Sequence, residues 1–159
     1  MNTLILGLGN LLLCDEGVGV HVARALSQRE LPPDVTVIEA GTAFLDVLPD
    51  IEKADRILLI NAMEGGGAPG SVYRVPFDQC IHPDMLASLH GFDLSRVLYM
   101  SGSDREPEVT VLGIEPARIE WGIELSPVLQ RALPAIEEAI LNELYRDLGL
   151  ISTSSQVAG

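Results

Sequence analysis

Residues 4–20, LILGLGNLLLCDEGVGV, decide how this chain folds. The apolar run that stops at Gly7-Leu8-Gly9 is typical of a buried strand that breaks into a loop. Two carboxylates, Asp15 and Glu16, then stand just before a segment with helical spacing. Side chains at the carboxyl end of a strand in an open α/β sheet line the crevice where ligands bind. Asp15 and Glu16 are therefore expected where chemistry would be done.

Strands and helices are predicted to alternate along the chain. The expected strands are Thr3–Leu8, Val35–Glu39, Arg56–Ile60, Ser71–Val75 and Glu108–Ile114. The expected helices are Gly17–Arg29, Ala43–Asp50, Met85–His90, Leu94–Ser101 and a last one that begins at Pro127 and ends at Gly149. This order predicts an α/β three-layer sandwich, with a mostly parallel twisted sheet and helices on both faces. A hairpin-like entry into the fourth strand predicts that this one strand is antiparallel.

The length and composition suit a single domain. With 159 residues, 47% of them hydrophobic, we expect one α/β domain over residues 1–149 and a flexible tail over residues 150–159. The formal charge of −13 argues against nucleic-acid and anionic-membrane partners, since both need basic patches. Two cysteines, no signal-peptide pattern and no apolar run long enough to span a bilayer favour a cytoplasmic protein, and we expect a monomer.

The glycine turn also allows a dinucleotide-binding interpretation, but two features of the sequence argue against it. The fingerprint needs a third glycine where this chain has Leu12. The following helix is also expected to begin too late to meet a pyrophosphate. We therefore expect no nucleotide cofactor, and a nucleotide-dependent oxidoreductase is the least favoured alternative.

Three polar residues stand at or near element ends and could share one site: Glu16, Asn61 and His90. Each also has a structural explanation. Glu16 could be a helix N-terminal acid, Asn61 a polar residue that turns a strand into a loop, and His90 a satisfied structural histidine. Together their oxygen and nitrogen donors would suit nickel or zinc, although no spacing in the sequence requires them to meet. His21 and His82 are expected at the surface or in a turn, and the loop through residues 65–70 is expected to be flexible.

The N-terminal stretch resembles the signature of the nickel–iron hydrogenase maturation endopeptidases. Further segments that resemble this family follow in order: Glu39-Ala40-Gly41-Thr42-Ala43, Asn61-Ala62, Ala68-Pro69-Gly70, Ser88-Leu89-His90, Gly113-Ile114-Glu115-Pro116 and Gly122-Ile123-Glu124-Leu125-Ser126. The resemblance covers nearly the whole chain and implies a cytoplasmic endopeptidase. Its partner would be a hydrogenase large-subunit precursor, whose C-terminal extension is cut after nickel has been installed.

The resemblance also implies a set of site residues. Glu16 and His90 match the family's metal-contacting glutamate and histidine, and would be the catalytic pair. The family's aspartate falls on Asn61, which brings no negative charge and cannot act as a general base near neutral pH. The nickel would be carried by the substrate and held by Glu16, Asn61 and His90. Water would be activated at Glu16, or by Glu64 or Asp15 reaching in.

Two alternatives to an active endopeptidase remain open. One is a cleavage-deficient module that binds the nickel-bearing precursor, which the asparagine at position 61 favours. The other is a metallohydrolase of small substrates with its own metal. No serine or cysteine nucleophile is implied, and Cys14 is expected to be a small buried filler.

Overall fold

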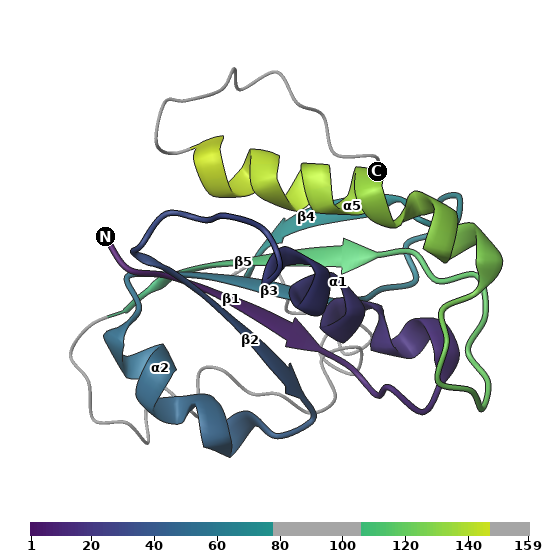
Figure 1. Cartoon of the computed structure of the whole chain (residues 1–159), viewed down its shortest axis with the longest axis horizontal. Helices are drawn as coiled ribbons and strands as arrows, with labels where there is room; N and C mark the ends of the chain where they lie inside the picture. The colour runs from purple at the N-terminus through teal and green to yellow at the C-terminus, as the bar shows by residue number, and fades with distance from the viewer. Residues whose placement is uncertain (78–105, 147–159) are drawn as a thin grey trace.

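Five strands form one sheet in the order β2-β1-β3-β5-β4 (Figure 1). The computed structural model describes residues 1–77 and 106–146. The strands are β1 (Thr3–Leu8), β2 (Val35–Gly41), β3 (Arg56–Ala62), β4 (Val72–Pro76) and β5 (Glu108–Ile114). The pairs β1–β2, β1–β3 and β3–β5 are parallel, and β4 runs antiparallel to β5 at the edge of the sheet. The predicted mixed sheet with one antiparallel strand is confirmed.

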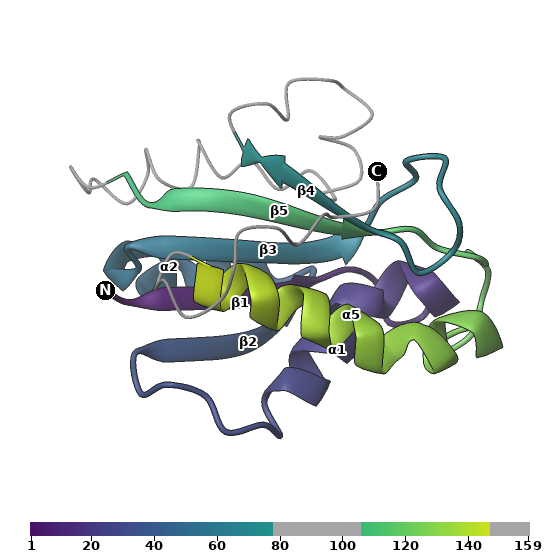
Figure 2. The same ribbon diagram turned by 90° about the horizontal axis from the view of Figure 1, so that it is seen from above.

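Helices cover both faces of this sheet, as the alternation of strands and helices predicted. The strand residues Leu6 and Leu59 face α2 (Leu48–Lys53) and share a core with Ile51. Their neighbours Ile5 and Leu58 point to the other face, which α1 (Val18–Leu26) and α5 (Pro127–Arg146) cover (Figure 2). Because both faces are buried, β1 and β3 read as continuous apolar runs.

The helix boundaries differ from the prediction at the two loops that follow β1 and β2. A 3-10 turn, η1 (Cys14–Gly17), precedes α1. The first helix therefore begins later than predicted, at Val18, and it ends earlier, at Leu26. Likewise η2 (Phe44–Val47) replaces the first turn of the predicted second helix, and α2 begins at Leu48. Pro49 lies in the first turn of α2, where its missing N–H leaves no bond unmade.

Gly19 explains how closely α1 approaches the sheet. A Cβ at this position would overlap the carbonyl oxygens of Ile60 and Leu8, at the carboxyl ends of β3 and β1. Only a glycine allows this contact between helix and strand backbones. The N-terminal turn of α1 is therefore seated directly over the ends of the two central strands.

A buried ion network fixes the C-terminal turn of α5 near the amino end of β3. Arg56, at the start of β3, donates from Nη1 to the Leu144 carbonyl (2.8 Å) and from Nη2 to the Glu143 carbonyl (2.6 Å). The Glu143 carboxylate, 5% exposed, also accepts from Nε of Arg74 on β4 (3.0 Å). Because each charge in this network has partners, its burial leaves no uncompensated charge.

Several sequence predictions fall outside the described residues. They are the helices Met85–His90 and Leu94–Ser101, the end of the last helix at Gly149, and the tail over residues 150–159. Among the helices within residues 1–77 and 106–146, none is both long enough and apolar enough to cross a membrane.

The substitution Gly19→Ala tests the close packing of α1 on the strand ends. Alanine is the better helix former, yet we expect it to lower the free energy of unfolding by about 2–4 kcal/mol, because its methyl group overlaps two backbone carbonyls. Gly66→Ala is the control, since its φ of +85° carries some strain but its Cβ would have no neighbour within 4 Å. Urea denaturation of both variants measures the difference. Equal losses, or a more stable Gly19→Ala protein, would contradict the packing described here.

Candidate active site

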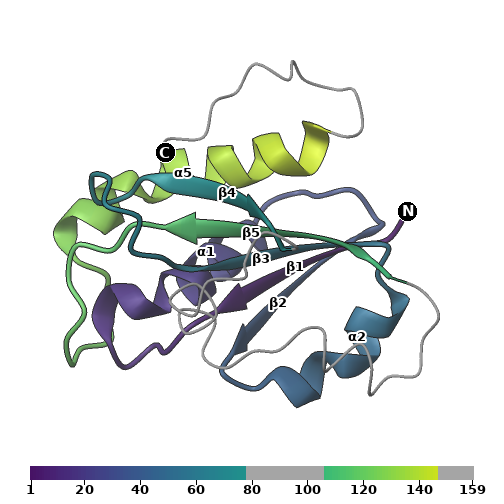
Figure 3. The same ribbon diagram turned by 180° about the vertical axis from the view of Figure 1, so that it is seen from behind.

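The carboxyl ends of β1, β2 and β3 lie together at one edge of the sheet (Figure 3). The loop that leaves β1 is tied to β2 there, because the Gly9 N–H donates to the Gly41 carbonyl (3.1 Å). This loop leads into η1, which contacts β3. Glu16 belongs to η1 and Asn61 to the last residues of β3. Two of the three predicted metal-contacting residues are thus at the same edge.

Asn61 lies within β3 rather than in the loop after it. It pairs with Gly113 of β5, and its side chain is on the face of β3 that Ile57 and Leu59 share with α2. Its exposed fraction is 0%. The sequence correctly placed Asn61 at the carboxyl end of the strand. It did not indicate that the amide would be completely covered.

Glu16 is half-buried and follows directly on the loop from β1. Its N–H donates to the Leu13 carbonyl (3.1 Å), a short-range bond within the 3-10 turn. An acid at this position in the sequence could also simply stabilise the first turn of a helix. The α-helix begins only at Val18, with Gly17 as its N-cap residue. Glu16 therefore precedes α1 instead of lying in its first turn.

Asp15 has a different role from the one considered for it. Its carboxylate is fully buried and accepts four hydrogen bonds: from the N–H groups of Ala117 (2.9 Å), Arg118 (2.9 Å) and Ser126 (2.7 Å), and from the Ser126 hydroxyl (2.7 Å). These donors all lie in the connection between β5 and α5. With its oxygens used in this way, Asp15 holds two loops together, and the suggestion that it reaches in to activate water is wrong.

Glu115 and Tyr73 form a second polar contact at this edge. The Glu115 carboxylate, 6% exposed, accepts from the Gly65 N–H (3.1 Å) and from the Tyr73 hydroxyl (3.2 Å). The same hydroxyl accepts from the Gly67 N–H (2.8 Å), and burial raises the pKa of Tyr73. The glycine loop predicted to be flexible is therefore tied down at two of its glycines. Glu64, the other suggested base, is exposed beside this loop.

The histidines contribute less than the acids to the described part of the site. His90 and His82 lie outside the described residues. His21 was expected at the surface, but it is half-buried on α1 and its imidazole N–H donates to the Ile123 carbonyl. Burial lowers the pKa of His21 from its usual value. His21 is thus a further link between α1 and the connection that Asp15 holds.

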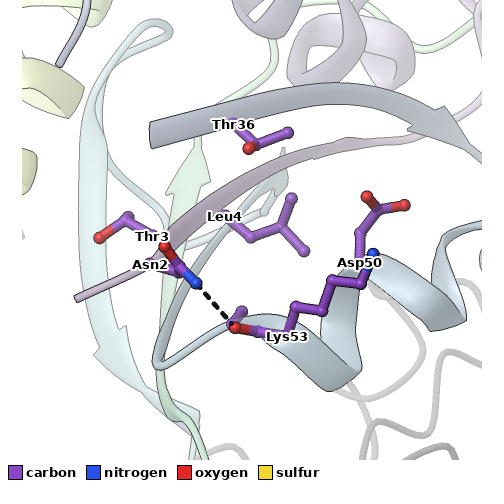
Figure 4. Close-up of a pocket in the computed structure, with 7 residues that line it drawn as sticks. Asn2, Thr3, Leu4, Thr36, Asp50 and Lys53 are labelled. Carbon is purple, nitrogen blue, oxygen red and sulfur yellow. Dashed lines mark hydrogen bonds between the residues drawn. The ribbon is translucent and has the colours of Figure 1, made fainter. Parts of the chain in front are cut away.

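No group of three His, Cys, Asp or Glu side chains that could hold a metal occurs within residues 1–77 and 106–146. A pocket elsewhere on the molecule lies at the amino ends of the strands, away from Glu16 and Asn61 (Figure 4). It is lined by Thr3, Thr36, Asp50 and Lys53, among others, and Asn2 donates to the Lys53 carbonyl across it (3.4 Å). Ligands of open α/β sheets bind at the carboxyl ends of the strands, so this pocket is not the candidate site.

Comparison with known proteins shows the family. The sequence model described as hydrogenase maturation protease matches residues 20–143. The Hydrogenase 2 maturation protease of Escherichia coli (strain K12) is 32% identical over 150 residues, which cover 88% of this chain and 89% of that protein. This chain belongs to the hydrogenase maturation protease family.

Two further relatives agree with this assignment. The hydrogenase expression/formation protein HupD of Thiocapsa roseopersicina is 32% identical over 158 residues, covering 94% of this chain and 70% of that protein. The solved structure of the hydrogenase maturating endopeptidase HybD from E. coli superposes with a TM-score of 0.75 at 29% identity, covering 94% of each chain. The family resemblance read from the sequence is confirmed, and the protein is a peptidase.

The adjacent acids Asp15 and Glu16 of this maturation protease predict opposite results when each is replaced by its amide. Asp15→Asn turns an NH₂ group toward N–H donors in a buried site, so we expect the free energy of unfolding to fall by about 2–4 kcal/mol. Glu16→Gln changes a half-buried side chain and should cost less than about 1 kcal/mol. Urea denaturation of the two variants in parallel is the measurement. Equal losses would mean that the two acids are not divided between structure and chemistry.

Proposed function

We propose that this protease removes the C-terminal extension of a nickel-loaded [NiFe]-hydrogenase large-subunit precursor. The nickel belongs to the substrate, and Glu16, Asn61 and His90 are the residues that contact it. The observation that carries the proposal is the position of Glu16, a half-buried carboxylate at the carboxyl edge of the sheet in a member of the maturation protease family. We further propose that the protein acts in the cytoplasm, as a monomer and without a nucleotide cofactor.

The donor set explains why cleavage would depend on nickel. A carboxylate and an imidazole are good ligands for a borderline divalent ion, and an amide oxygen is a weaker one. Without the ion, these side chains cannot bind the precursor, so its C-terminal extension is not positioned for cleavage. With the ion bound, the scissile amide is positioned beside Glu16. The specificity for nickel-loaded over nickel-free precursor would then follow from binding alone.

Hydrolysis itself needs a water and a group that accepts its proton. We assign the base to Glu16, because it is half-buried at the carboxyl ends of the strands, whereas Glu64 is exposed and the Asp15 carboxylate holds two loops together. The water oxygen adds to the amide carbonyl carbon, the C–N bond breaks, and the proton passes to the leaving nitrogen. The Cys14 thiol is buried against Gly122, which supports a mechanism in which Cys14 is not the nucleophile.

The alternative function is a module that binds the nickel-bearing precursor without cutting it. Asn61 favours this alternative, since it removes a negative charge from the donor set. The metallohydrolase alternative would require a metal of the protein's own. Metal analysis of the purified protein separates it from the proposal, because a substrate-borne nickel leaves the isolated protein without a stoichiometric ion.

A cleavage assay on the nickel-loaded precursor tests the proposed function directly. We expect wild-type protein to convert the precursor to a shorter product, seen as a mass shift, and nickel-free precursor to stay intact. Glu16→Ala and His90→Ala should each reduce the rate by at least about 10²-fold while circular dichroism stays unchanged. Wild-type binding without any mass shift would support the non-cutting module. Full cleavage by either variant would remove that residue from the mechanism.

The substitution Asn61→Asp tests whether position 61 faces the nickel. A carboxylate buried at 0% exposure is costly, so without metal we expect the variant to be about 2–4 kcal/mol less stable than wild type. Added nickel salt should restore most of this loss, and calorimetry should show tighter nickel binding than in wild type. Thermal unfolding with and without nickel is the measurement. A loss of stability that nickel does not reverse would show that position 61 does not contact the metal.

A further inference from the structure

Four large apolar side chains are exposed beside the candidate site. Ile119, Trp121 and Ile123, in the connection between β5 and α5, are 44%, 81% and 71% exposed, and Leu12, in the loop after β1, is 53% exposed. The Gly122 N–H donates to the Leu12 carbonyl (2.9 Å), which places the two loops side by side (Figures 1 and 3). We call these four residues the Trp121 patch. Exposed apolar surface of this kind marks interaction sites in soluble proteins.

The loop that carries this patch is held from several directions. The Asp15 carboxylate binds both of its ends, at Ala117–Arg118 and at Ser126. The Cys14 N–H donates to the Gly122 carbonyl (2.8 Å), and His21 donates to the carbonyl of Ile123. The backbone is thus fixed while the apolar side chains point to solvent. Fixed aromatic and aliphatic groups lose little entropy on binding, which suits them to be anchors of an interface.

Gly122 allows this close contact between the two loops. Its φ of +157° lies at the limit of the region that favours glycine, and a Cβ would come within 2.7 Å of the Cys14 sulfur. The motif Gly122-Ile123-Glu124-Leu125-Ser126 therefore has two functions. Gly122 and Ser126 hold the loop, and Ile123 is left for a partner. Catalysis as described above uses none of these residues.

The charges around the patch indicate what kind of surface would fit it. Glu120 and Glu124 are exposed on the same loop. Glu16 adds a third carboxylate in the turn after the neighbouring loop, where its N–H donates to the Leu13 carbonyl. The cation in this segment, Arg118, is already paired with Glu120 (3.3 Å). A complementary surface would present an apolar pocket bordered by lysine or arginine.

We propose that the Trp121 patch is the docking surface for the folded body of the large-subunit precursor, a surface with an apolar pocket bordered by basic residues. This inference rests on the proposed function, and adds a second contact beside the nickel. Leu13 follows Leu12 of the patch, pairs with Gly122 and accepts a hydrogen bond from the Glu16 N–H, so the patch lies next to Glu16. A precursor bound at the patch would therefore have its metal centre near the candidate site. Two copies of this chain, each with a formal charge of −13, repel one another, and an anionic membrane would be repelled as well.

The chain's single tryptophan gives a direct measurement of this contact. Protein labelled with 5-fluorotryptophan has one ¹⁹F resonance, from Trp121, and the unlabelled nickel-loaded precursor adds none. On titration with precursor we expect this resonance to shift and broaden, and its shift difference between H₂O and D₂O to shrink. A resonance that does not change while the precursor is bound and cleaved would overturn the docking proposal and leave the proposed function intact.

Kinetics of the double variant Trp121→Ala, Ile123→Ala provide the second readout. We expect its Kd and KM for the precursor to rise by about 30-fold or more, because buried aromatic anchors dominate interfaces, with kcat within about twofold of wild type. Glu16→Gln should instead lose kcat. Arg131→Ala, on the exposed side of α5, is the control and should change neither constant.

The remaining outcomes also decide the question. Unchanged Kd and KM in the double variant overturn the docking proposal, whatever the wild-type rate. A ¹⁹F shift that grows with the concentration of the protease alone shows that a second copy covers the patch, and a shift with phosphatidylglycerol vesicles shows a membrane. Either result overturns the proposal. Wild-type protein that neither binds nor cleaves the precursor overturns the proposed function, and the proposed occupant with it.

Discussion

The buried carboxylate of Asp15 is the interaction on which the carboxyl edge of this molecule depends. Asp15 lies in the turn that follows β1, and its carboxylate accepts four hydrogen bonds from the connection between β5 and α5. One side chain thus joins the loop after β1 to the start of α5. Glu16 is the next residue, so its position is set by the same contact. A fixed backbone at this point is what a preorganised site requires.

Other buried polar groups extend this arrangement to the rest of the sheet. Glu115 and Tyr73 hold the glycine loop that follows β3, at the same edge as Asp15. Near the amino end of β3, Arg56 and Glu143 bind the C-terminal turn of α5 to β3 and β4. Each of these groups has partners, so burial does not leave an uncompensated charge. The two ends of the sheet are therefore held by polar contacts, and its two faces by apolar ones.

Much of the fold could be predicted from the sequence, because strand and helix periodicities are local. The apolar runs of β1 and β3, the alternation of elements and the antiparallel β4 all follow from such patterns. The 3-10 turns before α1 and α2 could not be predicted, since they differ from helix by a small change in hydrogen bonding. Sheet order and strand register depend on contacts between distant segments.

The candidate site was predictable in its position and less so in its details. The carboxyl-end rule and the family resemblance both led to Glu16 and Asn61. The roles of Asp15 and Glu115 were missed because their partners are about a hundred and about fifty residues away, and no local pattern indicates them. The complete burial of Asn61 also depends on tertiary packing. That Glu16, Asn61 and His90 meet at one ion stays a prediction.

In the proposed mechanism the two neighbouring acids have different roles: Asp15 holds the loops together, and Glu16 contacts the substrate's nickel. Anomalous diffraction at the nickel absorption edge, from crystals grown with nickel salt, distinguishes these roles. We expect one peak within coordination distance of the Glu16 carboxylate and of His90, with Asp15 still bonded to the segment 117–126. Nickel coordinated by Asp15, or bound without Glu16, would contradict the account.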